Sequence, residues 1–600
     1  MKSVALKSNP FSLSGSPSAS GHRLSLRLAG PVLERALGLR GLGAIYDSAR
    51  DAGGPAEFCE ASLRYLNVKW EAAEEQIARI PRSGPLVVVA NHPFGALEGV
   101  IIAALLLRIR PDVKLLANHL LDRIPELRPV LVSVDPFGGE EAAGRNRIPL
   151  RSAIDWVRGG GALAVFPAGE VAHLTLRDRH VAEPRWSATV GKIIRRTSAN
   201  VVPVFFEGRN SAKFQALGLL HPRVRTALLP RELLNKRDRS IRVAIGRPIP
   251  VERLRRFERP SEIVEYLRLR TLMLADPCVS RAAGAAEFQN EGAATIAPAQ
   301  DINSLHDEIA RIPQGQQLAE LGPMVVFCCP ADSIPRVVKE IGRQREETFR
   351  RVGEGTGRGE DLDQFDEHYL HLFAWDREAR RLVGAYRLGL SDKIVSQQGI
   401  DGIYTHTLFK FNRSLLDQLG PAIELGRSFV VAEYQRSFAP LLLLWKGIGR
   451  FLVTHPQYRI LFGAVSISDE YESTTKRILM SFLRANCFDE ALSAGIKPRN
   501  PPRFARLRRD EERLLSATIH GIDEVDELVQ EIEADGRGVP ILLRQYLKLN
   551  AKLLGFNVDP VFGNVLDGLF YVDLTTVERS LLDRYLGREA ATAYLAYHRV

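Results

Sequence analysis

Short apolar runs alternate with helical patterns through the first half of the chain, and this rhythm limits the fold more than any other feature. A strand that leads through a helix to another strand forms a crossover unit, and successive units build a sheet covered by helices. Buried strands are predicted at 85–90, 113–117, 130–134, 162–166 and 201–206, with helical stretches such as 97–109 between several of them, and the unit is expected to close near 241–249. The first half is therefore predicted to be an α/β domain over 36–275, with its core at 80–250.

The composition changes after this domain. Residues 281–301 are rich in Ala and Gly and show little periodicity, which is typical of a linker. We place the linker at 276–320 and a second α/β or α+β domain at 321–600, and residues 1–35 are predicted to be a flexible basic leader. Two domains suit a chain of 600 residues, since a single hydrophobic core stops growing at about 250–300 residues.

The overall composition is that of a globular protein, with 45% hydrophobic and 25% charged residues, which excludes disordered, collagenous and coiled-coil classes. The net charge of +10 suits an anionic partner: nucleic acid, an anionic membrane surface or an acidic carrier protein. No basic motif interleaved with aromatic residues supports nucleic acid. Charge alone does not choose between the membrane and the carrier.

The cysteines and the apolar runs bear on location. Five scattered cysteines lack a repeated metal-ligand spacing, so no metal site is expected and a reducing cytoplasm fits. The longest apolar stretch, 99–107, is shorter than the roughly 20 residues that span a bilayer.

A histidine and an acid follow the first predicted strand, in the segment 91–99. Pro93 keeps His92 out of helical backbone angles, so His92 belongs to a loop, and Glu98 falls in the first turn of the next helix, where the helix dipole favours its charge. If the turn folds back, Glu98 can orient one ring nitrogen and leave the other to take a proton from a hydroxyl. A helix cap beside a surface histidine is the alternative interpretation.

Polar turns also follow the later strands. They lie at 135–139 together with Arg145 and Arg147, at 166–170 with Glu170, and at 206–209. Sites in α/β sheets form at the carboxyl ends of strands, so these turns are expected to gather around His92.

This set of turns resembles the glycerolipid acyltransferases over about residues 80–250. Two features differ from the broad family: five residues separate His92 from Glu98 instead of four, and the third block reads Phe-Pro-Ala-Gly-Glu, with Ala168 in place of a glutamate. The resemblance is to a branch that includes O-acyltransferases of amino-acid lipids. It implies an acyl-transfer site with His92 and Glu98 as catalytic residues and with Arg145, Arg147 and Glu170 as substrate contacts, and the differences argue against glycerol 3-phosphate as acceptor.

Charged residues recur through the second half of the chain. Each of them alone is weak evidence for a functional site, since solvated turns and structural ion pairs are common. In order they resemble the N-acyltransferase fold of acyl-homoserine-lactone synthases and, more closely, ornithine-lipid N-acyltransferases, over about 325–575. The matching residues are Arg345, Phe349, Asp363, Asp366, Arg387, Glu424 and Arg427, followed by 445–447, 463–468, 539–547 and a terminal Asp559, Phe562 and Asp567.

The second resemblance implies attack by an α-amine on an acyl thioester. The amine must be neutral, and Glu424 is predicted to be the base that removes its proton. Asp363 and Asp366 are predicted to hold a cationic amino acid. Arg387 and Arg427 either stabilise these acids or bind the carboxylate of the acceptor, and both roles stay open.

Together the two halves resemble a bifunctional ornithine lipid synthase with a GNAT-like C-terminal domain. The C-terminal domain would place a 3-hydroxyacyl group on the α-amine of ornithine, and the N-terminal domain would esterify the resulting hydroxyl. The donors would be acyl thioesters of acyl carrier protein (ACP) or CoA, with no bound cofactor. The expected partners are acyl carrier protein, an anionic membrane surface on the cytoplasmic face of the inner membrane, and the amino-acid and lyso-lipid substrates.

Two other interpretations remain open. One is a lysophospholipid acyltransferase fused to an N-acyltransferase for another acceptor such as glycine, and the other is a non-enzymatic protein that binds membranes or carriers. A basic segment is a candidate face for the carrier, with solvated surface as the alternative; it comprises Arg223, Arg225, Arg231 and residues 236–239.

Overall fold

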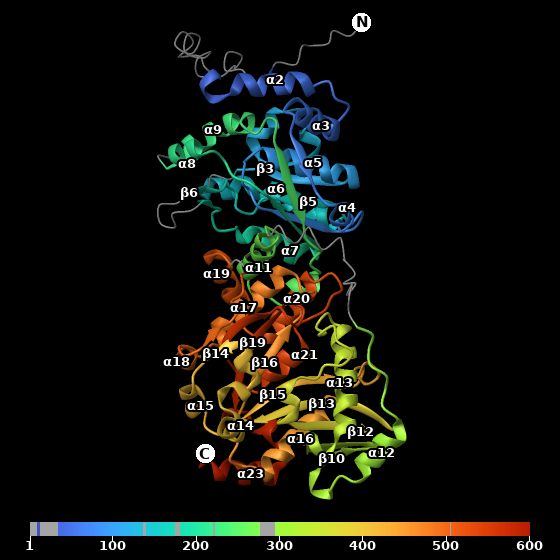
Figure 1. The fold of residues 1–600 in the computed structure, drawn as a ribbon. Helices are drawn as coiled ribbons and strands as arrows, with labels where there is room; N and C mark the ends of the chain where they lie inside the picture. The colour runs from blue at the N-terminus through green and yellow to red at the C-terminus, as the bar shows by residue number, and fades with distance from the viewer. Residues whose placement is uncertain are drawn as a thin grey trace. The chain divides into compact units, whose positions relative to one another are not determined.

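The computed structural model describes residues 9–11, 34–135, 140–174, 181–219, 222–275, 294–503 and 506–599. The chain divides into two compact units (Figure 1), the first made of Met1–Ala283 and Arg508–His520 and the second of Gly284–Leu507 and Gly521–Val600. Most of the predicted leader 1–35, and residues 276–293 of the predicted linker, lie outside the described residues.

The first unit contains a seven-stranded sheet in the order β1-β9-β8-β2-β5-β3-β4 and a separate β6–β7 pair, counted over the described residues. The strands are β1 (Lys69–Glu71), β2 (Leu86–Ala90), β3 (Val113–Asn118), β4 (Leu131–Val134), β5 (Ala162–Val165), β6 (His173–Leu174), β7 (Val181–Ala182), β8 (Asn200–Phe206) and β9 (Ser240–Ile245). The helices are α2 (Leu39–Ala49), α3 (Pro55–Tyr65), α4 (Glu74–Ile77), α5 (Leu97–Ile109), α6 (Glu140–Arg158), α7 (Ala188–Thr197), α8 (Ala212–Gly218), α9 (Pro222–Leu234), α10 (Val251–Leu254), α11 (Pro260–Met273) and α19 (Arg509–Thr518), with the 3-10 helices η2 (His119–Arg123) and η3 (Arg128–Val130).

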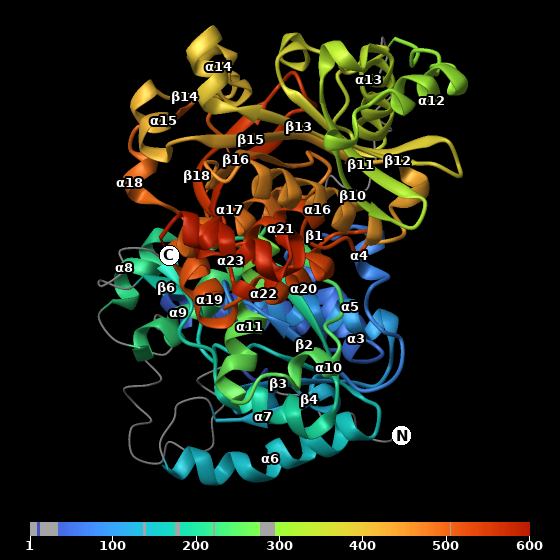
Figure 2. The same ribbon diagram turned by 90° about the horizontal axis from the view of Figure 1, so that it is seen from below.

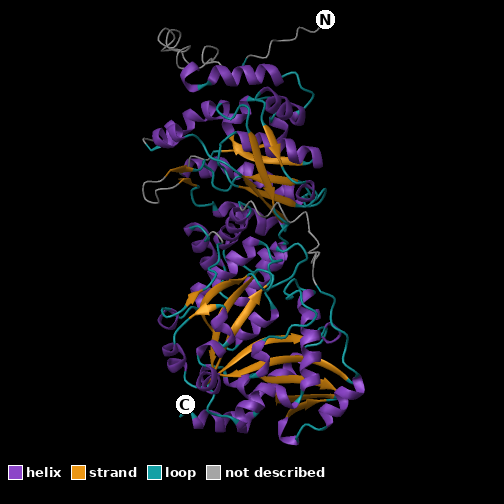
Figure 3. Cartoon of the chain, viewed as in Figure 1, coloured by secondary structure: helices purple, strands orange, loops and turns teal. Residues whose placement is uncertain are grey.

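The predicted strands and crossovers of the first half are confirmed. β2 pairs in parallel with β5 and β8, and β3 pairs in parallel with β4 and β5, while β9 is antiparallel to β8. β2 is buried along its whole length because helices cover both faces of the sheet (Figure 3). Leu86, Val88 and Ala90 pack with α3 and α5, whereas α6, α7 and α11 lie on the opposite face.

One helix of the first unit comes from far along the chain. α19 packs on α11, with Leu514 and Leu515 buried, although the sequence places residues 508–520 in the second predicted domain. Nothing local in an amphipathic helix identifies the surface that its apolar face will cover.

The second unit contains an eight-stranded sheet in the order β10-β11-β12-β13-β15-β16-β19-β18 and a separate β14–β17 pair, counted over the described residues. The strands are β10 (Gln317–Leu321), β11 (Met324–Pro330), β12 (Leu370–Asp376), β13 (Arg381–Leu390), β14 (Phe409–Lys410), β15 (Ala422–Val430), β16 (Ile460–Ile467), β17 (Lys497–Pro498), β18 (Lys552–Asp559) and β19 (Val565–Asp573). The helices are α12 (Ile302–Ala310), α13 (Pro335–Arg350), α14 (Ser391–Gln398), α15 (Arg413–Leu419), α16 (Ala439–Thr454), α17 (Ser473–Cys487), α18 (Glu490–Ser493), α20 (Ile522–Ile532), α21 (Ile541–Lys548), α22 (Arg579–Leu586) and α23 (Arg588–Tyr597), with the 3-10 helices η7 (Gln364–Glu367) and η9 (Tyr404–Thr407) among the connections.

The sheet of the second unit is covered on both faces (Figure 2). Val325 and Phe327 of β11 share a core with α13, whereas Val326 meets α16, so alternate residues of one strand serve the two faces. All neighbouring strands are antiparallel except β15 and β16. The predicted strands at 323–329, 370–375 and 382–388 and the predicted helix at 333–351 are confirmed as β11, β12, β13 and α13.

Part of the predicted linker 276–320 is regular structure. Asp301 caps α12 by accepting a hydrogen bond from the Ser304 amide, and Leu305 and Ile309 enter the core beside α13. Their spacing of four residues places both on one helix face. None of the helices formed by the described residues has the length and apolar character needed to cross a bilayer.

Candidate active sites

The loop that carries His92 is fixed where β2 ends. The Asn91 side chain donates to the carbonyl oxygen of Phe206 at 2.9 Å and accepts from the Phe206 amide at 2.6 Å. This exchange joins the carboxyl ends of β2 and β8. His92 therefore begins its loop at the centre of the sheet edge where sites form in α/β proteins.

The predicted contact between His92 and Glu98 is present. His92 Nδ1 lies 2.8 Å from Glu98 Oε1, and the Glu98 side chain is fully buried. The same carboxylate oxygen accepts hydrogen bonds from the amides of Phe94 at 2.9 Å and Gly95 at 2.8 Å. Gly95 has φ 109°, and a Cβ there would lie 2.7 Å from a Leu229 methyl carbon, so the turn that folds back requires glycine.

Glu98 is held as a carboxylate. Burial alone would raise the pKa of Glu98, but the charge of His92 and the donors from His92 and the Gly95 amide outweigh burial and keep the pKa below its ordinary value. The imidazole stacks on Phe166 with the ring centroids 4.7 Å apart, and it keeps 15% of its surface exposed. No described residue forms a hydrogen bond with Nε2, which leaves that atom able to accept a proton.

We expect Glu98→Gln to reduce the acid sensitivity of the fold. The pKa of Glu98 is lowered on folding, so its stabilisation is complete above the unfolded value of about 4.3 and is lost as the pH falls through the folded value. Urea unfolding between about pH 6 and about pH 3 should show a shallower fall in the free energy of unfolding than the wild type. The control is Glu141→Gln, whose side chain is 89% exposed. Equal slopes for Glu98→Gln and wild type would contradict the assignment.

Glu183 is a residue of this site that sequence reasoning missed. Its carboxylate accepts hydrogen bonds from the His92 amide and, at 2.9 Å, from the indole of Trp186. Burial raises the pKa of Glu183, and these donors and the charges of His92 and Arg268 only partly offset the rise. No local signal separates Glu183 from a surface acid, because its partner lies 91 residues away in the sequence.

The other predicted substrate contacts of the first unit lie away from the His92 ring. Arg145 and Arg147 are exposed on α6 instead of in a loop, and α6 follows the edge strand β4, which β5 and β3 separate from β2. Arg145 pairs with Asp135 at 2.7 Å. Glu170 follows the Phe166 turn but pairs with Arg225 at 2.8 Å and stays half exposed. Arg147 lines an open groove of about 530 Å³ together with Leu150, Arg151, Ile154, Asp155, Arg158 and Arg196.

The predicted basic face is interrupted in the structure. Lys236 is 8% exposed, and its ammonium donates to the carbonyl oxygen of Arg209 at 2.9 Å and lies 4.9 Å from the centre of the Phe94 ring. Burial lowers its pKa, against the opposing pull of Glu232. Lys236 therefore supports the His92 loop and contributes little charge to the surface.

A buried ionic network organises the second unit. Arg345 of α13 is 1% exposed and holds Asp366 with two nitrogens, at 3.2 and 2.9 Å. Its Nε lies 2.8 Å from Asp361, a fully buried residue that the sequence did not single out. Burial would raise the pKa of Asp366, but Arg345 and Arg387 hold it far below its ordinary value. Paired, planar contacts of this kind fix geometry as well as charge.

Two more arginines complete the network. Arg387 lies 2.6 Å from Asp363 and 3.3 Å from Asp366, and Arg427 lies 3.4 Å from Asp361 and 3.6 Å from Asp363. The structure thus brings together Arg345, Asp363, Asp366, Arg387 and Arg427. The acids predicted to hold a cationic amino acid already face arginines, a geometry that favours the stabilising role for Arg387 and Arg427.

The Glu424 side chain is buried, and both of its carboxylate oxygens accept hydrogen bonds. Its carboxylate accepts from the Tyr369 hydroxyl, from the Tyr404 amide at 3.1 Å and from the Thr405 amide at 2.6 Å. The rings of Tyr369 and Tyr404 each lie 5.1 Å from the guanidinium of Arg387. Both oxygens of the predicted base are therefore engaged in holding the aromatic rings around Arg387, and neither tyrosine was predicted.

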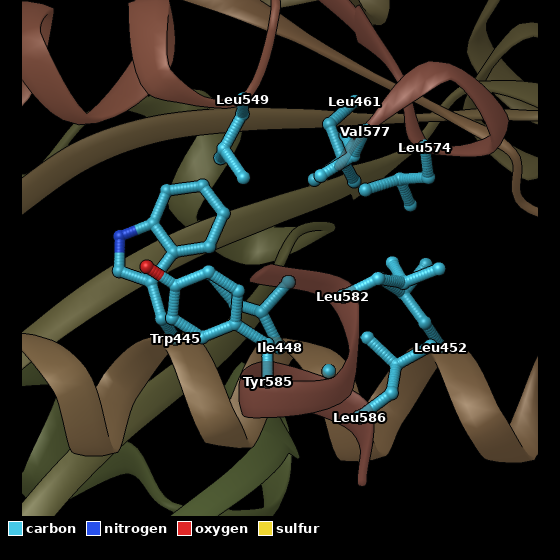
Figure 4. Close-up of a pocket in the computed structure, with 11 residues that line it drawn as sticks. Trp445, Ile448, Leu452, Leu461, Leu549, Leu574, Val577, Leu582, Tyr585 and Leu586 are labelled. Carbon is cyan, nitrogen blue, oxygen red and sulfur yellow. The ribbon is translucent and has the colours of Figure 1, made fainter. Parts of the chain in front are cut away.

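Two aromatic residues of the second resemblance belong to the core. Phe349 is 9% exposed and packs edge-to-face on Phe562 at 5.2 Å. Trp445 lines an apolar cavity between α16 and α22 (Figure 4). The cavity measures about 10 Å³, which is at most the room of one water molecule and leaves no space for an acyl chain. Within the described part of the chain, no group of three or more His, Cys, Asp and Glu side chains is arranged to hold a metal ion.

Comparisons with known proteins match each unit to an acyltransferase family. Residues 44–280 match an acyltransferase family model, and residues 344–446 match an acetyltransferase (GNAT) domain model. The chain thus has an acyltransferase domain followed by a GNAT-like domain, and the predicted α/β fold class is confirmed.

Three known proteins illustrate these similarities. A glycine Nα-acyltransferase of Bacteroides thetaiotaomicron is 31% identical over 254 residues, which make up 40% of this chain and 74% of that protein. A lyso-glycine lipid O-acyltransferase of the same organism is 28% identical over 222 residues, or 35% of this chain and 77% of that protein. A solved CoA-dependent acyl-homoserine lactone synthase matches 45% of this chain and 98% of its own at 13% identity, with a TM-score of 0.23.

Proposed function

Because this chain belongs to the family of the glycine Nα-acyltransferases and is an acyltransferase, we propose that it makes a doubly acylated amino-acid lipid in two steps. The second unit joins a 3-hydroxyacyl group to the α-amine of an amino acid. The first unit then joins a second acyl chain to the hydroxyl of that product.

The observation that carries this proposal is the pair of acyltransferase domains on one chain. The two domains match separate family models. One relative is named as a glycine Nα-acyltransferase and another as a lyso-glycine lipid O-acyltransferase. A chain that holds both activities keeps the poorly soluble lyso-lipid near its second site. This proximity raises the effective concentration of the lyso-lipid at that site.

His92 is proposed as the general base of the O-acyl transfer. Glu98 fixes the ring through Nδ1, and Nε2 takes the proton of the substrate hydroxyl as its oxygen attacks the carbonyl carbon of the thioester. The imidazolium that forms lies beside the buried carboxylate of Glu98, which stabilises it. The acyl carbon–sulfur bond then breaks, and the thiolate takes the proton from Nε2.

We also propose the acyl donors and the binding partners of the two reactions. Acyl thioesters of acyl carrier protein or CoA would supply both chains, and an acidic carrier suits the net charge of +10. The lyso-lipid acceptor would be met at an anionic membrane surface, on the cytoplasmic face of the inner membrane.

Ornithine is the head group implied by the resemblance of residues 325–575. Glycine is a second candidate, because the described relatives are named for glycine and for lyso-glycine lipid. The two candidates differ in mass and in charge, since ornithine carries a second amine.

Expression in a host that lacks such lipids tests the proposed function. Wild-type protein is expected to produce a new lipid with one amide-linked and one ester-linked acyl chain, and lipid mass spectrometry identifies its head group and both chains. Glycerophospholipids that change in acyl composition without any new amide-linked lipid would instead support the lysophospholipid acyltransferase. No lipid change in cells that contain folded protein would contradict both.

A further inference from the structure

A second group of acids lies beside Arg427 and has no arginine of its own. Glu354, Asp559 and Asp567 interact electrostatically with one another or with Arg427, yet among the described residues no Lys or Arg comes within ion-pair distance of these three carboxylates. Arg427 itself is shared with Asp361 and Asp363. The acids of this region therefore exceed the buried arginines that could neutralise them.

The sheet places two of these acids together. Asp567 of β19 pairs with Asn557 of β18, and Asp559 follows Asn557 by two residues, so Asp559 and Asp567 are diagonal neighbours on one face. They are 8% and 3% exposed. Buried carboxylates this close repel each other unless a proton or a cation lies between them.

One oxygen of Asp567 has no partner. Ser466 donates to Asp567 Oδ1 at 3.0 Å, whereas Oδ2 is buried and accepts no hydrogen bond from any described residue. The charges of Asp559 and Glu354 act on this carboxyl, which places it within their cluster. An unpartnered buried acceptor among acids is suited to a donor that carries positive charge.

Two carboxyl groups of the cluster have raised pKa values, as expected where burial and neighbouring acids both disfavour a negative charge. Burial, and then the neighbouring Asp559, raise the pKa of Asp567 to about 8. Burial and the neighbouring Glu470 raise the pKa of Glu354 to about 7. Glu470 is exposed and Glu354 is half-buried, so the cluster extends toward solvent on that side.

We infer that Glu354, Asp559 and Asp567 bind the ammonium group of the amino-acid acceptor and that Asp567 Oδ2 takes its proton. This inference rests on the proposed N-acyl transfer. It also replaces Glu424 as the base, because both oxygens of Glu424 are already engaged. Tyr404, Arg427 and Phe562 border the cluster: the charges of Asp559 and Asp567 act on Tyr404, and the Arg427 guanidinium lies 4.9 Å from the centre of the Tyr404 ring and 4.6 Å from that of the Phe562 ring.

The proposed N-acyl transfer moves two protons from the ammonium group, forms one carbon–nitrogen bond and breaks one carbon–sulfur bond. The ammonium gives one proton to Asp567, and the neutral nitrogen forms a bond to the carbonyl carbon of the acyl thioester. The carbon–sulfur bond breaks, and the departing thiolate takes the second proton from nitrogen. Asp567 releases its proton to solvent before the next turnover, as a base with a pKa near the working pH can do.

Asp567→Asn tests the inference, with Asp417→Asn as the control because the Asp417 side chain is 67% exposed. In purified full-length protein, Asp567→Asn is expected to lower kcat for N-acylation about 100-fold or more. The wild-type rate should rise with pH up to about pH 8, the pKa of Asp567, and this rise should be absent from the residual activity of the variant. Wild-type kcat in a folded Asp567→Asn protein would overturn the inference.

Folding stability separates this effect from damage to the structure. The pKa of Asp567 is higher in the folded protein than the unfolded value of about 3.9, so stability declines as the pH rises from about 4 to about 8. A neutral Asn removes that decline, so the variant is expected to have a higher Tm than wild type at about pH 8. A lower Tm at that pH would overturn the inference.

Ligand binding tests the proposed ammonium site even if no acylation is observed. Glycine and ornithine are expected to raise the Tm of wild type but not of Asp567→Asn, and glycolate, which lacks an amine, should raise neither. A larger shift with ornithine would indicate that the cluster also holds the side-chain amine. Equal shifts in both proteins, or none in wild type, would overturn the inference. Amine-dependent shifts without any N-acyl product would retain the site and contradict the proposed function.

Discussion

His92→Ala is expected to stop the second acylation and leave the first intact. The variant removes the proposed proton acceptor of the O-acyl transfer, and general bases contribute about 10²–10⁴-fold to a rate. The N-acyl transfer that we propose belongs to the second unit, and none of its proposed steps uses His92. Cells that produce the variant should therefore accumulate the mono-acylated amino acid in place of the doubly acylated lipid, as measured by lipid mass spectrometry.

His119→Ala is the control for this experiment, because His119 is an exposed residue of η2 in the same unit. It should give the doubly acylated product at the wild-type level. Doubly acylated lipid at the wild-type level from His92→Ala would exclude His92 as the base. Loss of both lipids from His92→Ala would mean that the first acylation also depends on this residue.

Arg345→Met is expected to destabilise the second unit by about 3–5 kcal/mol, the usual effect of removing one partner from a buried ion pair. Arg345 is 1% exposed and holds both Asp361 and Asp366, so the variant leaves two buried carboxylates with less compensation. Met has a similar length, so most of the packing volume is kept. The loss should therefore report on charge and hydrogen bonding.

Hydrogen exchange measured by mass spectrometry can locate this loss. Peptides of α13, β12 and β13 should lose protection, whereas peptides of β2 and β5 in the first unit should keep it. The matched control is Arg351→Met, which removes a half-exposed partner of Glu347 and is expected to cost less than about 1 kcal/mol. Equal losses for the two variants would show that burial of the Arg345 network contributes little to stability.

The sequence by itself determined the elements and the contacts that are local. α5 begins at Leu97 and ends at Ile109 as predicted, because an apolar run with a proline shortly after its end defines a buried helix within one stretch of chain. The His92–Glu98 contact was predictable for the same reason. His92 lies in the loop before α5 and Glu98 lies in the first turn of that helix, so the proline and glycine between them determine how closely they approach.

Only the tertiary structure decided which distant side chains meet. Glu183 reaches the His92 amide across 91 residues, and Tyr369 reaches Glu424 across 55. Arg145 and Arg147 were expected with the polar turns near His92, but they lie on α6, which follows the edge strand of the sheet.

The charge balance of the second unit is also a tertiary property. Asp361 and Asp567 are both aspartates, yet Asp361 lies within ion-pair distance of two arginines, whereas no Lys or Arg among the described residues comes that close to Asp567. That difference depends on how β18, β19 and α13 are arranged in space, because electrostatic interactions depend on distance and burial and not on spacing along the chain. The sequence identified the charged residues, and the fold decided which of them are neutralised.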